Sequence, residues 1–265
     1  MSQSIGKNIR KLRKENKDAI IVVMGCYSQK YHLEAINDCD ADIVVGTSNR
    51  KLIPQLIKEY INSHKKLDFC SENSRLFKYE ELGVVSCSEN TRAYLKIQDG
   101  CNNFCSYCII PYVRGRVRSK NYDKCINEAR DLVNSGHKEI VLAGIHTGQY
   151  NDNGKRLSDV INGLSKIDGL ERIRLSSVEI VELDEGMLEI LKNNNKFVSH
   201  LHIPLQAGSN NVLKLMNRRY TREEFIDMVN NIKKLRPGIS LSTDIIVGFP
   251  GETEEEFYNT YKFFI

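Results

Sequence analysis

The sequence predicts an α/β protein in which a partial doubly wound domain precedes an incomplete parallel βα barrel. Short β-branched runs alternate with helical patterns along the 265 residues. After residue 91, five such runs follow one another, each separated from the next by at least one helical segment. A chain of this length with 41% hydrophobic side chains can bury a sizeable core, as one large domain or two small ones.

The first block has the pattern of a small parallel sheet covered by helices. IIVVMG and DIVVG are short continuous apolar runs of the kind that such a sheet buries. The strands are predicted at 20–25 and 42–46, and the helices at 28–37 and 50–61. We therefore predict a partial doubly wound domain over 1–62 and, where NSHKK and CSENSR break the pattern, a linker with little regular structure over 63–90.

The second block, 91–265, predicts the barrel. Its strands are expected at 93–98, 138–144, 171–177, 199–205 and 239–248. Two capping boxes predict helix starts, Thr221 with Glu224 and Thr253 with Glu256, and Gly136 is expected to end a helix that begins near Asp123. Functional residues of such barrels gather at the carboxyl ends of the strands. The last strand of a complete barrel is not found, so we expect an incomplete one.

Composition predicts a cytoplasmic protein with no membrane partner. The first residues, MSQSIGKNIRKLRKENK, are basic and lack an apolar signal region, and the longest apolar stretch is far shorter than the roughly 18 residues that span a bilayer. The net charge is +4. Basic residues crowd two places: Lys7, Arg10, Lys11, Arg13, Lys14 and Lys17, and then Arg114, Arg116, Arg118 and Lys120. Each run is either a solvated face or a surface for an anionic partner such as RNA.

Three cysteines within eight residues are the strongest chemical signal. The chain has eight cysteines and no secretion signal, which favours metal ligands or catalytic thiols over disulfides. Cys101, Cys105 and Cys108 follow the first barrel strand with the spacing C-x3-C-x2-C. Three cysteines would leave one iron of a 4Fe-4S cluster open to a substrate or cofactor. The alternative is a structural zinc site or free thiols, but zinc needs a fourth ligand and the nearest downstream histidine is His137.

With these residues in place, the chain resembles the radical S-adenosylmethionine (SAM) enzymes, and among them the methylthiotransferases. The motifs are GCYSQ, IQDGCNNFCSYCIIPYVRGRVRS, RLSSVE, HIPLQAGSNNVLKLMNRRY and TDIIVGFPGETEEEF. The resemblance implies the (βα)6-type partial TIM barrel of that superfamily. LAGIHTGQY (142–150) and RGRVRS look most like the branch that acts on threonylcarbamoyladenosine beside the tRNA anticodon.

The resemblance also implies cofactors and the residues that bind them. Cys101, Cys105 and Cys108 would hold a 4Fe-4S cluster whose open iron chelates SAM, so that one electron releases a 5′-deoxyadenosyl radical. Contacts to SAM are expected from Tyr107, Gly144, Ser177, Glu179, Gln206 and Gly248. The radical would remove hydrogen from an adenine carbon, and sulfur insertion would complete a methylthio group.

The family's second cluster, which supplies or relays sulfur, uses three cysteines of the N-terminal domain. Cys26 in GCYSQ matches the third of them, and the other two have no counterpart here. Cys39 and Cys70 are expected to be ordinary thiols. The family's last barrel strand and its small RNA-binding domain are also missing, so the chain looks truncated at both ends. We expect it to build part of the SAM-cleaving half and not to complete methylthiolation alone.

The expected partners are tRNA and an electron donor of flavodoxin or ferredoxin type, and we expect a monomer. Arg114, Arg116 and Arg118 alternate, so on an extended loop they would point the same way toward phosphates, with Arg218 and Arg219 as a second candidate. A rim of salt bridges is the alternative. Two other functions remain open: methylthiolation of isopentenyladenosine tRNA or of a ribosomal protein, and a non-catalytic RNA-binding module stapled by a structural metal.

Overall fold

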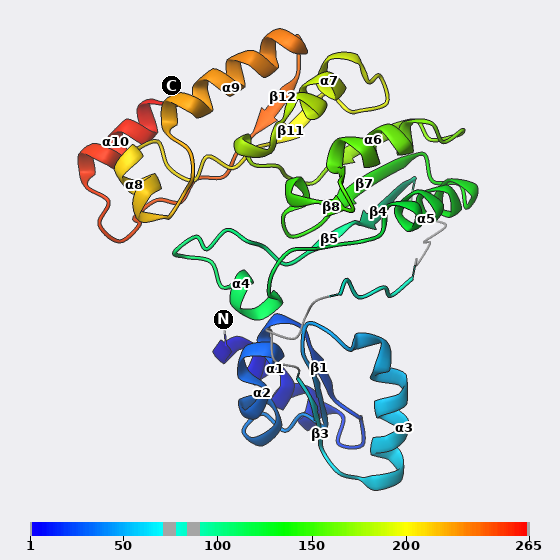
Figure 1. The fold of residues 1–265 in the computed structure, drawn as a ribbon. Helices are drawn as coiled ribbons and strands as arrows, with labels where there is room; N and C mark the ends of the chain where they lie inside the picture. The colour runs from blue at the N-terminus through cyan, green and yellow to red at the C-terminus, as the bar shows by residue number, and fades with distance from the viewer. Residues whose placement is uncertain (1, 71–77, 84–90, 264–265) are drawn as a thin grey trace. The chain divides into compact units, whose positions relative to one another are not determined.

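The computed structural model describes residues 2–70, 78–83 and 91–263, and of residues 2–4 only the backbone. The chain divides into two compact units (Figure 1). The first comprises residues 1–83 together with 109–116, and the second comprises 84–108 and 117–265. This grouping differs from the predicted division at residues 62 and 91, because a short segment after the cysteine loop belongs with the N-terminal unit.

The first unit contains a parallel three-stranded sheet in the order β1-β2-β3. Its strands are β1 (Val22–Met24), β2 (Ile43–Val45) and β3 (Leu67–Phe69). Its helices are α1 (Ser2–Glu15), α2 (Cys26–Asn37), the 3-10 turn η1 (Arg50–Leu52), α3 (Ile53–Ser63) and α4 (Ile110–Arg114). The central strand β2 is fully buried, as its apolar run predicted.

Two elements of this unit were missed by the sequence analysis. Strand β3 lies inside 63–90, where a linker with little regular structure was predicted, and pairs with β2. Helix α1 forms in the basic N-terminal run because Ile5 and Ile9 share a face and pack beside Ile21 and Cys39. The many lysines and arginines hide this narrow apolar stripe.

The second unit has the predicted alternation of parallel strands and helices. Strands β4 (Arg92–Lys96), β7 (Glu139–Ala143) and β10 (Arg172–Leu175) form one parallel sheet in the order β10-β7-β4. Strands β11 (His200–His202) and β12 (Ser240–Ser242) form a second parallel pair, and a parallel bridge from Ile173 to Phe197 links the two. The five strands thus follow one another in chain order as an open, curved sheet.

Helices separate these strands and share one large core with them (Figure 1). They are α5 (Tyr122–Asn134), α6 (Leu157–Ser165), α7 (Glu185–Asn193), α8 (Asn210–Leu215), α9 (Arg222–Leu235) and α10 (Glu254–Lys262). Both predicted capping boxes are present, at the starts of α9 and α10. Gly136 has the positive φ of 99° that favours glycine after a helix. The strand expected over 239–248 is confined to Ser240–Ser242, since only those residues pair along β11.

Short elements fill the carboxyl edge of the sheet. Antiparallel pairs join β5 (Gln98–Asp99) to β6 (Arg118–Ser119) and β8 (Asn151–Asp152) to β9 (Lys155–Arg156), and 3-10 turns form at η3 (Thr147–Gln149) and η4 (Ile180–Glu182). Within the described residues, every helix is too short or too polar to cross a membrane.

A buried carboxylate holds the opposite, amino edge of the sheet together. Glu139, on the central strand, stands in register with Arg92 on one side and Arg172 on the other. Its oxygens lie 2.9 Å from Arg92 Nε, 3.0 Å from Arg172 Nε and 2.8 Å from Arg174 Nε. Burial would raise the pKa of Glu139, but the arginines outweigh it and the pKa is lowered.

We expect Glu139→Gln to destabilise the chain by roughly 1–3 kcal/mol at neutral pH, since three guanidinium groups lose their shared acceptor. A carboxylate with a lowered pKa contributes stability above its unfolded pKa, and the contribution disappears as the pH falls through the folded value. Urea unfolding at pH 7 and at acid pH measures the effect. The difference between wild type and variant should shrink in acid, whereas an equal difference at both pH values would contradict the role of this charge.

Candidate functional site

The three cysteines lie at the carboxyl edge, on the loop that follows β4 and β5. Gly100 makes the entry turn with a φ of 75°, and its N–H donates to the Asp99 carboxylate at 2.8 Å. Cys101 and Cys105 are each only 8% exposed, while Cys108 is half-buried. The loop therefore presents three thiols at a largely buried position.

A buried histidine and a buried carboxylate stand beside Cys101. His146, just after β7, places Nδ1 3.3 Å from Cys101 Sγ and Nε2 2.6 Å from Glu182 Oε1. Burial alone would lower the pKa of His146, but the neighbouring thiol and carboxylate raise it to about 10. Burial in turn raises the pKa of Glu182. The pair was not predicted, although His146 lies in the motif LAGIHTGQY. Glu182 is 36 residues and Cys101 is 45 residues away from it, and contacts over such separations leave no local signal.

A second cation and carboxylate pair stands beside Cys105. Arg218 Nη1 lies 3.2 Å from Cys105 Sγ, and Nη2 lies 2.8 Å from Glu179 Oε1. The Arg218 side chain is only 3% exposed and faces Glu179 and Cys105, and its contact with RNA stays a prediction. Glu179, predicted to contact SAM, also accepts a hydrogen bond from Asn103 Nδ2 at 3.0 Å. These contacts tie the loop after β10 to the cysteine loop.

The donor set fits an anionic cluster better than a single ion. The Asn103 N–H donates to Cys101 Sγ at 3.3 Å, and His146 and Arg218 add two cationic neighbours to the thiols. Hydrogen bonds and positive charge near the sulfurs stabilise iron-sulfur clusters. In tetrahedral zinc sites thiolate sulfurs stand about 3.8 Å apart. Among the described residues, His32, Asp68 and Cys70 bring their ligand atoms within 4.8 Å of one another, which is the closeness that a single ion needs.

The other residues predicted to contact SAM follow the ends of strands. Gly144 has no room for a side chain, because a Cβ atom there would stand 3.0 Å from both Gln98 Oε1 and Thr147 Cγ2. The Ser177 carbonyl accepts a hydrogen bond from the Thr147 hydroxyl at 2.6 Å. Tyr107 is partly exposed and meets Phe249 edge to face, with ring centroids 6.4 Å apart. These positions give backbone and ring surface along the carboxyl edge.

Two further positions of this group have unusual backbone angles. Gln206 has a φ of 70°, which is uncommon for a residue with a side chain, and pairs with Ile245 through a parallel bridge. Gly248 has a φ of 67°, and its N–H donates to Glu252 Oε2 at 2.6 Å. Positive φ is ordinary for glycine, whereas a residue such as Gln206 in this conformation is more frequent at functional sites. The contacts of all six residues to SAM remain a prediction.

The arginines after the cysteine loop do not form the expected row on an extended loop. Arg114 ends helix α4, and its Nε donates to Cys26 Sγ at 3.2 Å within the first unit. Arg118 lies in β6, 7% exposed and 3.9 Å from Asp99. The predicted row is therefore wrong, and Arg116 and Arg219 remain the exposed members of the predicted RNA-binding set.

The remaining described thiols have structural surroundings. Cys39 is buried beside Tyr27 and Arg10, and Cys125 lies in the core of the second unit. Cys70 Sγ donates to the Ser28 carbonyl at 3.4 Å, which ties the end of β3 to α2. Cys87 lies outside the described residues.

The parallel sheet with a three-cysteine loop at its carboxyl edge defines a class of enzyme. The chain belongs to the Radical SAM superfamily, whose family model matches residues 95–264. Its cofactors are those of the superfamily, a 4Fe-4S cluster and SAM. In solved structures, the radical SAM methyltransferase TsrM from Kitasatospora setae matches with a TM-score of 0.73 and 14% identity, over 99% of this chain and 56% of that one. This likeness shows the fold.

Sequence relatives narrow the class further. The threonylcarbamoyladenosine tRNA methylthiotransferase MtaB of Bacillus subtilis is 45% identical over 96% of this chain, and that of Aquifex aeolicus is 40% identical over 96%. The tRNA-2-methylthio-N(6)-dimethylallyladenosine synthase of Alkaliphilus oremlandii is 39% identical over 95%. The chain spans 57%, 62% and 54% of the lengths of these three relatives.

The charge on His146 can be tested without any cofactor. In the metal-free chain we expect the imidazole to stay protonated at neutral pH and to titrate near 10. The stability that it contributes is full below 6.5, its ordinary pKa, and is lost as the pH rises through about 10. Glu182→Gln removes the carboxylate, so the pKa of His146 should fall, whereas Glu171→Gln on the surface should leave it unchanged. NMR of the imidazole resonances measures both, and a His146 that titrates near its ordinary pKa in wild type would refute the pairing.

Proposed function

We propose that this chain is the radical SAM part of a methylthiotransferase that acts on threonylcarbamoyladenosine in tRNA. The observation that carries the proposal is the buried CNNFCSYC loop at the carboxyl edge, with cations at two of its three sulfurs. The identity to the two MtaB proteins, 45% and 40%, supports this branch over the dimethylallyladenosine branch at 39%. Methylthiolation of isopentenyladenosine tRNA or of a ribosomal protein is the alternative within the same chemistry.

Cys101, Cys105 and Cys108 would hold the 4Fe-4S cluster and leave one iron for SAM. When bound, the cluster supplies the electron that cleaves SAM to methionine and the 5′-deoxyadenosyl radical. The protein's own part is to bury the thiolates and to balance their charge with His146 and Arg218. Tyr107, Gly144, Ser177, Glu179, Gln206 and Gly248 would line the SAM site along the carboxyl edge.

Cys26 would be the remaining ligand of the sulfur-supplying cluster. It begins helix α2, where backbone N–H groups favour a thiolate, and Arg114 Nε donates to its sulfur. We further propose the predicted domains, 1–62 and 91–265, as the working division of the protein, with β3 of the segment 63–90 completing the sheet of the first. A cytoplasmic monomer that receives electrons from a flavodoxin or ferredoxin completes the proposal.

The first test is formation of 5′-deoxyadenosine from SAM by anaerobically reconstituted chain with a strong reductant. We expect Cys105→Ala to abolish the product, because a ligand is lost. Cys125→Ala, a matched change in the core, should retain it. Product in the Cys105→Ala protein would place the chemistry elsewhere. Colourless protein with zinc and no iron would favour instead an RNA-binding module with a structural metal. The target is then identified by which macromolecule gains the mass of the methylthio group.

Contact with tRNA should depend on salt, because arginine releases counterions from phosphates. We expect the affinity for an anticodon stem-loop to fall linearly with salt on logarithmic axes. Arg116→Gln should reduce that slope by about 1. Arg130→Gln, on the outer face of α5, is the control that should not change it. An affinity independent of salt would contradict phosphate contact altogether.

A further inference from the structure

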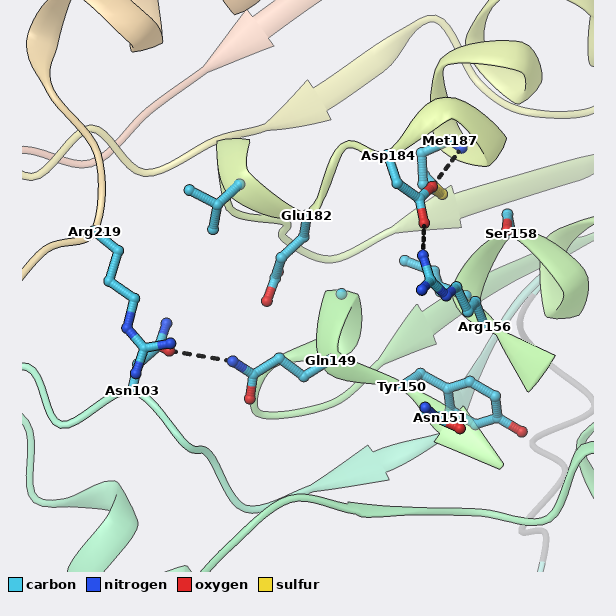
Figure 2. Close-up of a pocket in the computed structure, with 13 residues that line it drawn as sticks. Asn103, Gln149, Tyr150, Asn151, Arg156, Ser158, Glu182, Asp184, Met187 and Arg219 are labelled. Atoms are coloured by element: carbon cyan, nitrogen blue, oxygen red, sulfur yellow. Dashed lines mark hydrogen bonds and ion pairs between the residues drawn. The ribbon is translucent and has the colours of Figure 1, made fainter. Parts of the chain in front are cut away.

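A cavity of about 560 Å³ adjoins the cysteine loop inside the second unit (Figure 2). Its lining residues come from the cysteine loop, η3, the start of α6, the segment before α7 and the turn between α8 and α9: they include Asn103, Gln149, Ser158, Glu182, Asp184 and Arg219. The volume lies within the range of small-molecule sites, which is about 300–1,000 Å³. None of the six residues proposed for SAM lines it, so it is a separate space from the predicted SAM site.

Only the side chain of His146 lies between the cavity wall at Glu182 and the proposed cluster ligand Cys101. Glu182 lines the cavity and also contacts His146, which in turn contacts Cys101 Sγ. Asn103 lines the cavity from the cysteine loop itself, and its Oδ1 accepts a hydrogen bond from Gln149 Nε2 at 3.1 Å. A ligand in this cavity would therefore lie next to the reacting centre, where a substrate belongs.

The charges of the cavity do not balance. Asp184 is neutralised by Arg156 at 3.0 Å and caps α7 by accepting from the Met187 N–H (Figure 2). Glu182 is paired with His146. Arg219 lines the same cavity and is exposed, and among the described residues it has neither a hydrogen bond nor an ion pair. One guanidinium is thus left for an anion brought by the ligand.

The surroundings favour a carboxylate over a phosphate. A single guanidinium binds a carboxylate through two parallel hydrogen bonds and balances its one charge. A phosphate monoester carries more than one negative charge, which one guanidinium does not balance. The uncharged part of the ligand would contact the other lining residues. These offer the amides of Gln149 and Asn151 and the apolar side chains of Val181 and Met187.

We propose that this cavity binds an adenine nucleoside through a carboxylate on its N6 substituent, with Arg219 as the residue that recognises the carboxylate. The proposal rests on the proposed function, since the threonyl group of threonylcarbamoyladenosine carries this carboxylate. A dimethylallyl group has no charge and would leave Arg219 unpaired in a partly desolvated site. Arg219 is therefore a specificity residue for the side group, and it takes no part in the radical chemistry.

The test is binding of two free nucleosides to the 265-residue chain: N6-threonylcarbamoyladenosine and its methyl ester, which lacks the charge. By isothermal calorimetry we expect wild type to bind the acid about tenfold or more tightly than the ester, the range of a charge-assisted hydrogen bond. Arg219→Gln should bind both alike, and Arg219→Lys should keep part of the preference. Arg130→Gln, an exposed arginine on α5 that does not line the cavity, is the control and should keep all of it.

Three results would overturn the proposal: a wild type that binds neither nucleoside, one that binds acid and ester equally, or an Arg219→Gln variant with an unchanged preference. Two control measurements identify other uses of Arg219. An equal loss of affinity for modified and unmodified stem-loops, with a smaller salt slope, would assign it to a phosphate. A weaker affinity for SAM would assign it to the cofactor's carboxylate. Either result overturns the proposal.

Failure of this inference can be distinguished from failure of the proposed function. The nucleoside measurements need no turnover, whereas the proposed function depends on SAM cleavage and on the mass of the RNA product. If the product forms on threonylcarbamoyladenosine while Arg219→Gln keeps the preference, only the inference fails. If wild type discriminates acid from ester but never cleaves SAM, only the proposed function fails.

Discussion

Two buried cation and carboxylate pairs determine the electrostatics of the site. His146 with Glu182 stands at Cys101, and Arg218 with Glu179 stands at Cys105. Three thiolates close together in a largely buried loop would repel one another strongly without such partners. Each cation therefore faces a sulfur on one side and a carboxylate on the other, so that it reduces the repulsion between the thiolates at two of the three sulfurs.

The same pairs also explain why loops far apart in sequence meet at one edge. The segments after β7 and α8 bring the cations His146 and Arg218 to the cysteine loop, and the segment after β10 brings both carboxylates. Asn103 adds a hydrogen bond to Glu179, and its amide accepts one from Gln149. Polar side chains that are buried need partners, and here the partners come from several βα units. The carboxyl edge is thus organised by the requirements of its charges as much as by the apolar core beneath it.

Local patterns in the sequence predicted most of the fold and the chemical core of the site. Continuous β-branched runs predicted the parallel strands, and the capping box formed by Thr253 and Glu256 predicted the start of α10. The spacing of the cysteines was itself the signal for the loop. What could not be predicted depends on distance in space: β3 is recognisable only from its pairing with β2, and His146 and Arg218 acquire their roles from partners more than 30 residues away. The arginine row failed for the same reason, because the helix ending at Arg114 and the burial of Arg118 are set by tertiary contacts.

The Glu139 network and the cysteine loop occupy opposite edges of one sheet. The arginines around Glu139 bind the amino ends of β4, β7 and β10, and the residues of the site follow the carboxyl ends of the same strands. Strands only a few residues long separate the two, and they transmit position without sharing any charged group between the edges. The loops at the carboxyl edge can therefore change while the amino edge keeps the strands in register. Substrate choice and fold maintenance can in this way diverge independently during evolution.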